Sequence, residues 1–375
     1  MADRPLIMTV DAVQGRARAG TIETARGRIP TPVFMPVGTR GAVKTLDTDD
    51  LERLGPPIVL GNTYHLMERP GAELIAELGG LHAFMDWPGH LLTDSGGFQI
   101  FSLEPRIGEK GATFRSVYDG SPVELSPERS VGIQELLGAD IAMVLDVCTA
   151  LPADRATLRE AFELTLRWAE RSKAVHGRAD QAQFGIVQGG VDVDLRAESA
   201  ERTVEIGFDG YAVGGLSVGE SRAAMVPALR AATGLLPADR PRYFMGVGDP
   251  VGLIEAVHNG IDMFDCVLPT RLARHGTALT GHGRLNLRNL RFARDDRPID
   301  PDLDHPLSSR YSRAYVRHLL VTNEPTAGRI ITLHNLAWLA DLTARMRRAV
   351  LGGRFEALRS EIWATWAPGE GPPPG

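Results

Sequence analysis

Short runs of consecutive apolar residues recur along the chain, and each run ends abruptly at a glycine, an acid or an amide. Their apolarity is continuous rather than alternating, which predicts strands that are buried on both faces, as in a parallel sheet. The eight runs span residues 31–38, 57–62, 90–97, 140–147, 184–190, 211–216, 242–248 and 261–267.

Stretches of helical character separate these runs, and several begin with the Asp, Ser or Pro that helix N-termini prefer. Eight β–α alternations predict the α/β class and a (β/α)8 TIM barrel, whose chemistry lies at the C-terminal ends of the strands. The predicted helices span residues 46–54, 68–78, 127–137, 152–175, 192–206, 221–232 and 250–258.

Two segments of the chain are additions to the eight β–α units of a minimal barrel. Residues 9–30 alternate and turn at glycine, which predicts a β-hairpin that covers one end of the barrel as a lid. Residues 268–334 form an insertion before C-terminal helices that we expect over 335–366. We therefore predict a single domain over 1–366 that includes this insertion, followed by a flexible Pro/Gly-rich tail at 367–375.

Composition narrows the class of protein. The chain has 375 residues, of which 43% are hydrophobic and 23% are charged, values that are ordinary for a soluble globular protein. Its two cysteines, Cys148 and Cys266, lie far apart in the sequence, which excludes a disulfide framework and favours a reducing compartment. No apolar run reaches the roughly 18 residues of a membrane helix, and the N-terminus does not resemble a signal peptide. We expect a cytoplasmic protein without membrane contact.

Charge is distributed unevenly. The net charge is −6, yet residues 271–297 carry seven arginines and two acids, so this segment is +5 and the remainder is −11. A cationic stripe on an acidic protein favours focused binding of a polyanion. The alternative is an Arg-rich surface loop that is simply solvated.

Two carboxyl groups at predicted strand ends are candidates for catalysis. Asp94 follows a strand within TDSGGFQIFSL and is a candidate general acid or base. Asp265 lies within GIDMFDCVLPTR and is a candidate nucleophile that forms an ester-like intermediate. Paired carboxyl groups of this kind serve retaining glycosidases. The alternatives are a turn or helix cap for Asp94 and a buried, fully hydrogen-bonded carboxylate for Asp265.

A second group of residues offers hydrogen bonds to a purine. Asp146, Gln188 and the backbone of Gly215 and Leu216 supply the donors and acceptors that the edge of guanine requires, and Phe98 is placed to stack on the base. Strand-end structure is the alternative for Gln188 and Gly215.

The motifs in this chain resemble those of the tRNA-guanine transglycosylase (queuine tRNA-ribosyltransferase) family, bacterial type. The resemblance covers about residues 9–366. It rests on LGNTYHL (60–66), LTDSGGFQIFSL (92–103), FGIVQGG (184–190), GGLSVGE (214–220), FMGVGDP (244–250), GIDMFDCVLPTR (260–271), YSRAYVRHL (311–319) and LHNL (333–336).

The resemblance implies an enzyme of queuosine biosynthesis that replaces guanine at the wobble position of GUN-anticodon tRNAs by 7-aminomethyl-7-deazaguanine (preQ1). It implies Asp265 as nucleophile on ribose C1′ and Asp94 as general acid/base. Val218 matches the bacterial form of the pocket. The implied base-binding residues are Ser95, Gly96, Gly97, Phe98, Asp146, Gln188, Gly215, Leu216 and Met245. The implied RNA-binding residues are Gly246, Val247, Gly248, Asp249, Pro250, Val251, Gly252, Thr270, Arg271, Leu272, Ala273 and Arg274.

The sequence departs from the family pattern where the family holds a structural zinc ion. The four ligand positions are occupied by Leu303, His305, Ser308 and His334, so only the last matches. Two imidazoles do not make a structural zinc site. We expect no cofactor and no zinc, with packing around Leu303 and Leu307 in its place; an unusual site that includes Asp302 or Asp304 is the alternative.

Two smaller departures are Val147, where the family usually carries Glu, and Leu272, where a polar residue is usual. The resemblance also implies a homodimer that binds one tRNA. Two other functions stay open: a non-catalytic RNA-binding paralogue, and a related transglycosylase that acts on DNA or another tRNA position.

Overall fold

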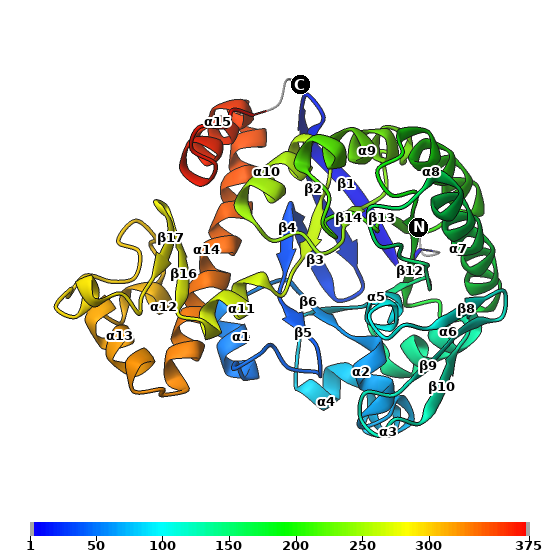
Figure 1. Ribbon diagram of the computed structural model, residues 1–375, viewed down its shortest axis with the longest axis horizontal. Coiled ribbons are helices and arrows are strands. Elements are labelled where there is room, and N and C mark those ends of the chain that lie inside the picture. Colours follow the sequence, from blue (N-terminus) through cyan, green and yellow to red (C-terminus); the bar gives the residue numbers. More distant parts are fainter. Residues whose placement is uncertain (1–3, 373–375) are drawn as a thin grey trace.

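The computed structural model describes residues 4–372 and is built around a parallel barrel (Figure 1). Its sheet has the order β4-β15-β14-β13-β12-β11-β7-β6-β5. The first and last strands come from one segment that Pro36 interrupts, so the sheet closes on itself. Proline has no N–H to donate to the ladder. The strands are β4 (Val33–Met35), β5 (Val37–Gly38), β6 (Ile58–Gly61), β7 (His90–Thr93), β11 (Ile141–Met143), β12 (Ala182–Val187), β13 (Gly210–Val213), β14 (Arg242–Phe244) and β15 (Met263–Asp265).

Each of the eight apolar runs contributes to this barrel, which confirms the predicted fold class. Helices follow the strands, and Asp or Ser side chains cap α6, α7, α8, α9 and α10 at their N-termini. The helices close to their predicted spans are α1 (Thr48–Leu54), α6 (Pro127–Leu137), α7 (Arg155–Val175), α8 (Val193–Ile206), α9 (Arg222–Leu235) and α10 (Pro250–His258).

The predicted helix over 68–78 is wrong. Pro70 disfavours helical geometry in the residue before it, and Gly71 has φ 111°, so the chain breaks there into α2 (Thr63–Glu68) and α3 (Ala72–Glu77), followed by α4 (Gly80–Met85). Between β7 and α6 lie four short elements that were not predicted. They are α5 (Gly97–Phe101) and a three-stranded antiparallel sheet of β8 (Arg106–Gly108), β9 (Gly111–Arg115) and β10 (Pro122–Leu125).

The N-terminal lid exists and has three strands, β1 (Leu6–Gln14), β2 (Ala17–Thr24) and β3 (Gly27–Thr31). It covers the barrel end where the strands begin, because Arg18 of β2 binds Asp262 just before β15. Arg26 similarly reaches Asp140 before β11, with 3.0 Å between Nε and Oδ1. The candidate site lies at the opposite end, where the strands finish, which we call the mouth of the barrel.

The insertion projects from the barrel and appears in gold in Figure 1. It has a small core of its own around Leu287, Phe292 and Val316. α14 begins at Thr326, inside the segment predicted as insertion, because its first turns pack against this small core. The elements are α11 (Leu268–Arg274), β16 (Thr277–Thr280), β17 (Gly283–Asn286), the 3-10 helix η1 (Leu290–Phe292), α12 (Pro306–Ser309) and α13 (Arg313–Val321), then α14 (Thr326–Leu351) and α15 (Phe355–Trp366).

Residues 367–372 of the predicted tail contain no helix or strand, and the rest of that tail lies outside the described residues. Among residues 4–372, no helix combines the length and the apolar character that crossing a membrane requires.

Candidate active site

Asp94 follows β7 and its carboxylate is held by three donors. Oδ2 accepts from Nδ2 of Asn62 at 2.6 Å, and Oδ1 accepts from the backbone N–H groups of Thr63 at 2.9 Å and Gly96 at 3.1 Å. Burial raises the pKa of Asp94 to about 7, helped by the nearby negative charges of Asp265 and Asp146, while the N–H donors oppose the shift. A carboxyl group with this pKa can give or take a proton at neutral pH.

Asp265 ends β15 and binds through one oxygen only. Its Oδ1 accepts from the hydroxyl of Tyr243 at 2.6 Å and from the N–H of Gly246 at 2.8 Å, whereas Oδ2 has no hydrogen bond within residues 4–372. Burial raises the pKa of Asp265, and these two donors counteract it. The hydrogen bonds fix the carboxylate and leave one oxygen available to attack an electrophile.

Asp146 and Gln188 lie side by side at the ends of β11 and β12. Nε2 of Gln188 donates to Oδ2 of Asp146 at 2.6 Å, and the hydroxyl of Ser95 donates to Oδ1 at 3.5 Å. Asp146 is 8% exposed, and burial raises its pKa to about 6. The two side chains therefore place a carboxylate and an amide at a largely buried position at the C-terminal end of the barrel.

Glycines bring the backbone close to this pair. A Cβ on Gly97 would lie 2.7 Å from Oδ1 of Asp146, one on Gly214 would lie 2.8 Å from Nε2 of Gln188, and one on Gly215 would overlap Oε1 of the same residue. Any side chain at these positions would displace the two polar groups. Gly214 was missed as a site residue, although the paired glycines of GGLSVGE carried the signal.

The loop after β13 adds backbone donors. No acceptor within residues 4–372 pairs with the N–H groups of Gly215 or Leu216, whereas the N–H groups of Ser217 and Val218 donate to the carboxylate of Glu220. Glu220 was missed by the sequence analysis, and its place in GGLSVGE is the signal that could have found it. The carboxylate of Asp146, together with the free N–H groups of Gly215 and Leu216, matches the donor and acceptor pattern on the edge of guanine.

The remaining predicted base-binding residues lie on segments that follow β7 and β14. Phe98 is 57% exposed at the start of α5, where its ring is open to a stacking partner. Met245 is partly exposed after β14, and Gly96, with φ 84°, begins the turn between Asp94 and α5.

Comparison with known proteins places the chain among relatives along nearly its whole length. The family model described as queuine tRNA-ribosyltransferase matches residues 12–368. The chain belongs to the queuine tRNA-ribosyltransferase family. Proteins named queuine tRNA-ribosyltransferase from Mesorhizobium japonicum and Solidesulfovibrio magneticus are 52% and 53% identical, each over 98% of this chain and 99% of their own. A protein of the same name from Caulobacter vibrioides is 53% identical over 95% of this chain and 97% of its own.

These matches confirm the resemblance drawn from the motifs, and the family comprises the base-exchange enzymes of queuosine biosynthesis. The matched span includes both carboxyl groups at the barrel mouth and the complete insertion. The roles of individual residues stay predictions.

The predicted RNA-binding residues differ in their exposure to solvent. Gly246 is exposed, and Arg271 and Arg274 are exposed one turn apart on α11, whereas Leu272 is half-buried. Asp249 caps α10 and pairs with Arg222 at 2.6 Å. The other predicted RNA contacts are buried: Val247, Gly248, Pro250, Val251, Gly252, Thr270 and Ala273.

The arginines of the insertion are largely unpaired. Among the ten arginines between residues 271 and 317, only Arg297 and Arg313 form ion pairs in the described structure, and both bind Asp295. The rest keep their charge available for an external anion.

The residues at the family's zinc positions do not fit the ion. His334 is fully buried, with Nε2 at 2.6 Å from the carbonyl oxygen of Leu279 and Nδ1 at 2.8 Å from the hydroxyl of Ser308. Because a carbonyl only accepts, Nε2 carries the proton and Nδ1 accepts from Ser308. Both nitrogens are occupied, and burial lowers the pKa of His334 to about 4.

The neighbouring candidates for a zinc site are also engaged elsewhere. Nδ1 of His305 accepts from the N–H of Leu307 at 3.2 Å, and Asp302 pairs with His282 at 2.8 Å. Leu303 is 7% exposed and packs in the main core. Residues 4–372 contain no group of three or more His, Cys, Asp or Glu side chains arranged for a metal ion.

Proposed function

We propose that this chain exchanges guanine at the wobble position of GUN-anticodon tRNAs for preQ1, with Asp265 as nucleophile and Asp94 as general acid and base. The unequal bonding of these two carboxyl groups carries the proposal. Asp265 keeps one oxygen free of hydrogen bonds within the described residues, whereas Asp94 is held through both oxygens and has a pKa of about 7.

The reaction proceeds in two displacements. Oδ2 of Asp265 attacks ribose C1′ while the bond from C1′ to N9 of guanine breaks, and protonated Asp94 gives its proton to the departing base. The resulting ester links Asp265 to the ribose. Asp94 then takes the N9 proton of the incoming base, whose nitrogen attacks C1′ and releases the carboxylate. Two inversions at C1′ retain the β configuration.

The pocket reads the base through hydrogen bonds. The N1–H and N2–H groups of guanine donate to the carboxylate of Asp146, and the free N–H groups of Gly215 and Leu216 donate to O6. Phe98 stacks on the ring. The wobble base must leave its stack before C1′ is reachable, and anticodon loops allow this. Arg271 and Arg274 supply cations to the phosphates beside it.

Incorporation of labelled guanine into an unmodified GUN-anticodon tRNA transcript tests the proposal. We expect incorporation by the wild type and none by Asp265→Asn. Asp239→Asn is the matched control, because this exposed carboxylate lies before β14 at the other end of the barrel. A folded wild type that binds the tRNA without incorporating guanine contradicts the proposed activity and favours the non-catalytic paralogue or another target.

We also propose that the insertion is held together without zinc, by the hydrogen bond that His334 accepts from Ser308 and the one that it donates to the carbonyl of Leu279. Replacing His334 with Ala removes both bonds and leaves a cavity, so we expect a loss of about 3 kcal/mol in the free energy of unfolding. Urea denaturation measures it, and elemental analysis with and without a chelator measures bound zinc. Stoichiometric zinc, or a chelator that lowers the midpoint, contradicts the proposal.

The finer expectations about organisation belong to the same proposal. We infer a single domain over residues 1–366 and a homodimer that uses the insertion. The resemblance to the family supports the dimer. Sedimentation of the full chain distinguishes monomer from dimer. The cytoplasmic location expected from the cysteines stays a prediction.

A further inference from the structure

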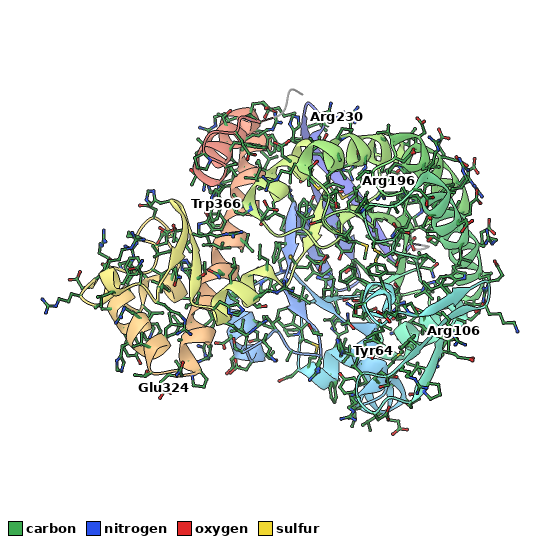
Figure 2. The ribbon with its side chains drawn as sticks, viewed as in Figure 1. Tyr64, Arg106, Arg196, Arg230, Glu324 and Trp366 are labelled. Atoms are coloured by element: carbon green, nitrogen blue, oxygen red, sulfur yellow. The ribbon has the colours of Figure 1, made fainter. Side chains whose placement is uncertain are left out.

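Arg196 is a completely buried arginine that binds only backbone. It lies in the first turn of α8, on the side that faces the barrel strands (Figure 2). Its Nε donates to the carbonyl of Gly190 at 2.7 Å, Nη1 donates to that of Val187 at 2.8 Å, and Nη2 donates to that of Gly215 at 3.3 Å. One planar guanidinium therefore connects the end of β12 and the loop after it with the loop after β13.

This placement is costly, which argues for a specific role. Three other buried arginines face carboxylates: Arg18 binds Asp262, Arg313 binds Asp295 and Arg359 binds Glu255. No carboxylate forms an ion pair with Arg196 within residues 4–372. Burial of a charge without an opposite charge is unfavourable, and the positive end of the α8 dipole adds repulsion. Burial accordingly lowers the pKa of Arg196 to about 9.

The three carbonyls surround the base-reading residues. Val187 and Gly190 flank the pair Gln188–Gly189, and Gly215 is the residue on which a Cβ would overlap Gln188. Arg196 thus binds the chain on both sides of the amide that contacts Asp146. A shift of either loop would break one of its hydrogen bonds.

Peptide geometry extends the effect to a donor of the pocket. In a trans peptide, the C=O and the following N–H point in opposite directions. The hydrogen bond from Arg196 holds the carbonyl of Gly215 toward α8, so the N–H of Leu216 points away from α8. That N–H, like the N–H of Gly215, has no acceptor within the described residues.

We propose that Arg196 is a positioning residue for the base pocket, which fixes Gln188 and the Gly215–Leu216 peptide for a purine whose carbonyl oxygen adjoins N–H donors. The inference rests on the proposed base exchange and adds the residue that sets affinity for the incoming base. Arg196 acts through the backbone and does not touch the base itself.

Arg196→Lys is the sharpest variant, because an ammonium group keeps the positive charge but cannot span three carbonyls. We expect the KM for guanine to rise about tenfold, as for the loss of one or two hydrogen bonds, while the KM for tRNA and kcat change less than about threefold. Arg18→Lys is the matched control at the opposite end of the barrel. It should lower the melting temperature without changing the KM for guanine.

Two outcomes overturn the inference. A folded Arg196→Lys enzyme with the wild-type KM for guanine shows that the guanidinium is not needed for base binding. Equal rises in the KM for guanine in both variants show a general loss of stability instead. A wild type that exchanges no guanine contradicts the proposed function, which separates that failure from failure of this inference.

A measurement on the wild type covers the case in which Arg196→Lys does not fold. Hydrogen exchange followed by mass spectrometry, with and without guanine, reports on the backbone directly. We expect guanine to slow exchange in peptides that cover residues 187–190 and 214–216, and also in the first turn of α8. Protection of the two loops without any change in α8 contradicts coupling through Arg196.

Discussion

The two ends of the barrel bury carboxyl groups in opposite ways. At the end where the strands begin, Asp262 is fully buried, and its Oδ1 accepts from Nε of Arg18 at 2.8 Å while Oδ2 accepts from the N–H of Arg242 at 2.7 Å. Asp140 at the same end is bound by Arg26 and His82. Burial alone would raise the pKa of Asp140, but hydrogen bonds from His82 and from the N–H of Leu91 lower it.

At the mouth, Asp94, Asp146 and Asp265 form no ion pair with any Arg, Lys or His of the described residues, and burial raises the pKa of all three. Carboxyl groups with cationic partners stabilise the fold in their charged form. Those without such partners cost stability when charged, which is consistent with the chemical roles proposed for them. The contrast runs along one strand, because Asp262 and Asp265 stand at the two ends of β15.

The strongest test exchanges these two aspartates for Asn in separate variants. Asp265→Asn should lower the exchange rate by at least about 10⁴-fold, as expected for loss of a nucleophile, without lowering the free energy of unfolding. Asp262→Asn leaves Arg18 buried without its partner, which should lower that free energy by about 3–5 kcal/mol. Rates per folded molecule and urea denaturation measure both. Comparable losses of stability in the two variants would remove the distinction between the ends.

Sequence patterns predicted one side of this contrast, because strand ends are easy to locate, whereas the ion pairs at the other end were not predicted. Continuous apolar runs stop close to where the chain leaves the barrel, which predicts Asp94 and Asp265 at the C-terminal ends of their strands. The sheet of β8, β9 and β10 was missed because its strands are only three to five residues long, too short for their alternation to stand out from a loop. The break near Pro70 was overlooked because the apolar spacing continues across it.

Long-range partners could not be predicted from one sequence. Ser308 and His334 are 26 positions apart, and their hydrogen bond exists only because α12 packs on α14. Arg196 is one polar position in an amphipathic helix until the rotation of α8 directs it into the barrel. The sequence therefore indicated reacting groups more completely than the groups that hold them in place.

The pH dependence of stability gives a smaller test of the same contrast. The folded state keeps a proton on Asp146 up to a pKa of about 6, whereas an unfolded aspartate releases it near 3.8. Between pH 7 and pH 5 the folded state therefore binds more protons at this residue, and acidification stabilises it by about 1 kcal/mol. Asp146→Asn should lose this increment relative to the wild type.

The control for that measurement is Glu128→Gln. Its hydrogen bond to Arg171 lowers the pKa of Glu128 to about 2, so its stabilising effect is present above its ordinary pKa and is lost only at lower pH. Urea denaturation at pH 7 and pH 5 should give this variant the wild-type difference between the two values. An Asp146→Asn variant that also keeps the wild-type difference contradicts a raised pKa at the mouth.

The smallest effect we predict concerns the hydroxyl of Tyr243, which donates to Oδ1 of Asp265 at 2.6 Å. Tyr243→Phe removes a donor that favours the carboxylate, so the pKa of Asp265 should rise further, and the acid limb of the kcat profile should move to higher pH. Stability should change little, because the N–H of Gly246 still binds Oδ1. Tyr211→Phe is the control, since that hydroxyl accepts from the N–H of Phe208 far from the mouth. An unshifted acid limb in Tyr243→Phe would mean that Asp265 does not set it.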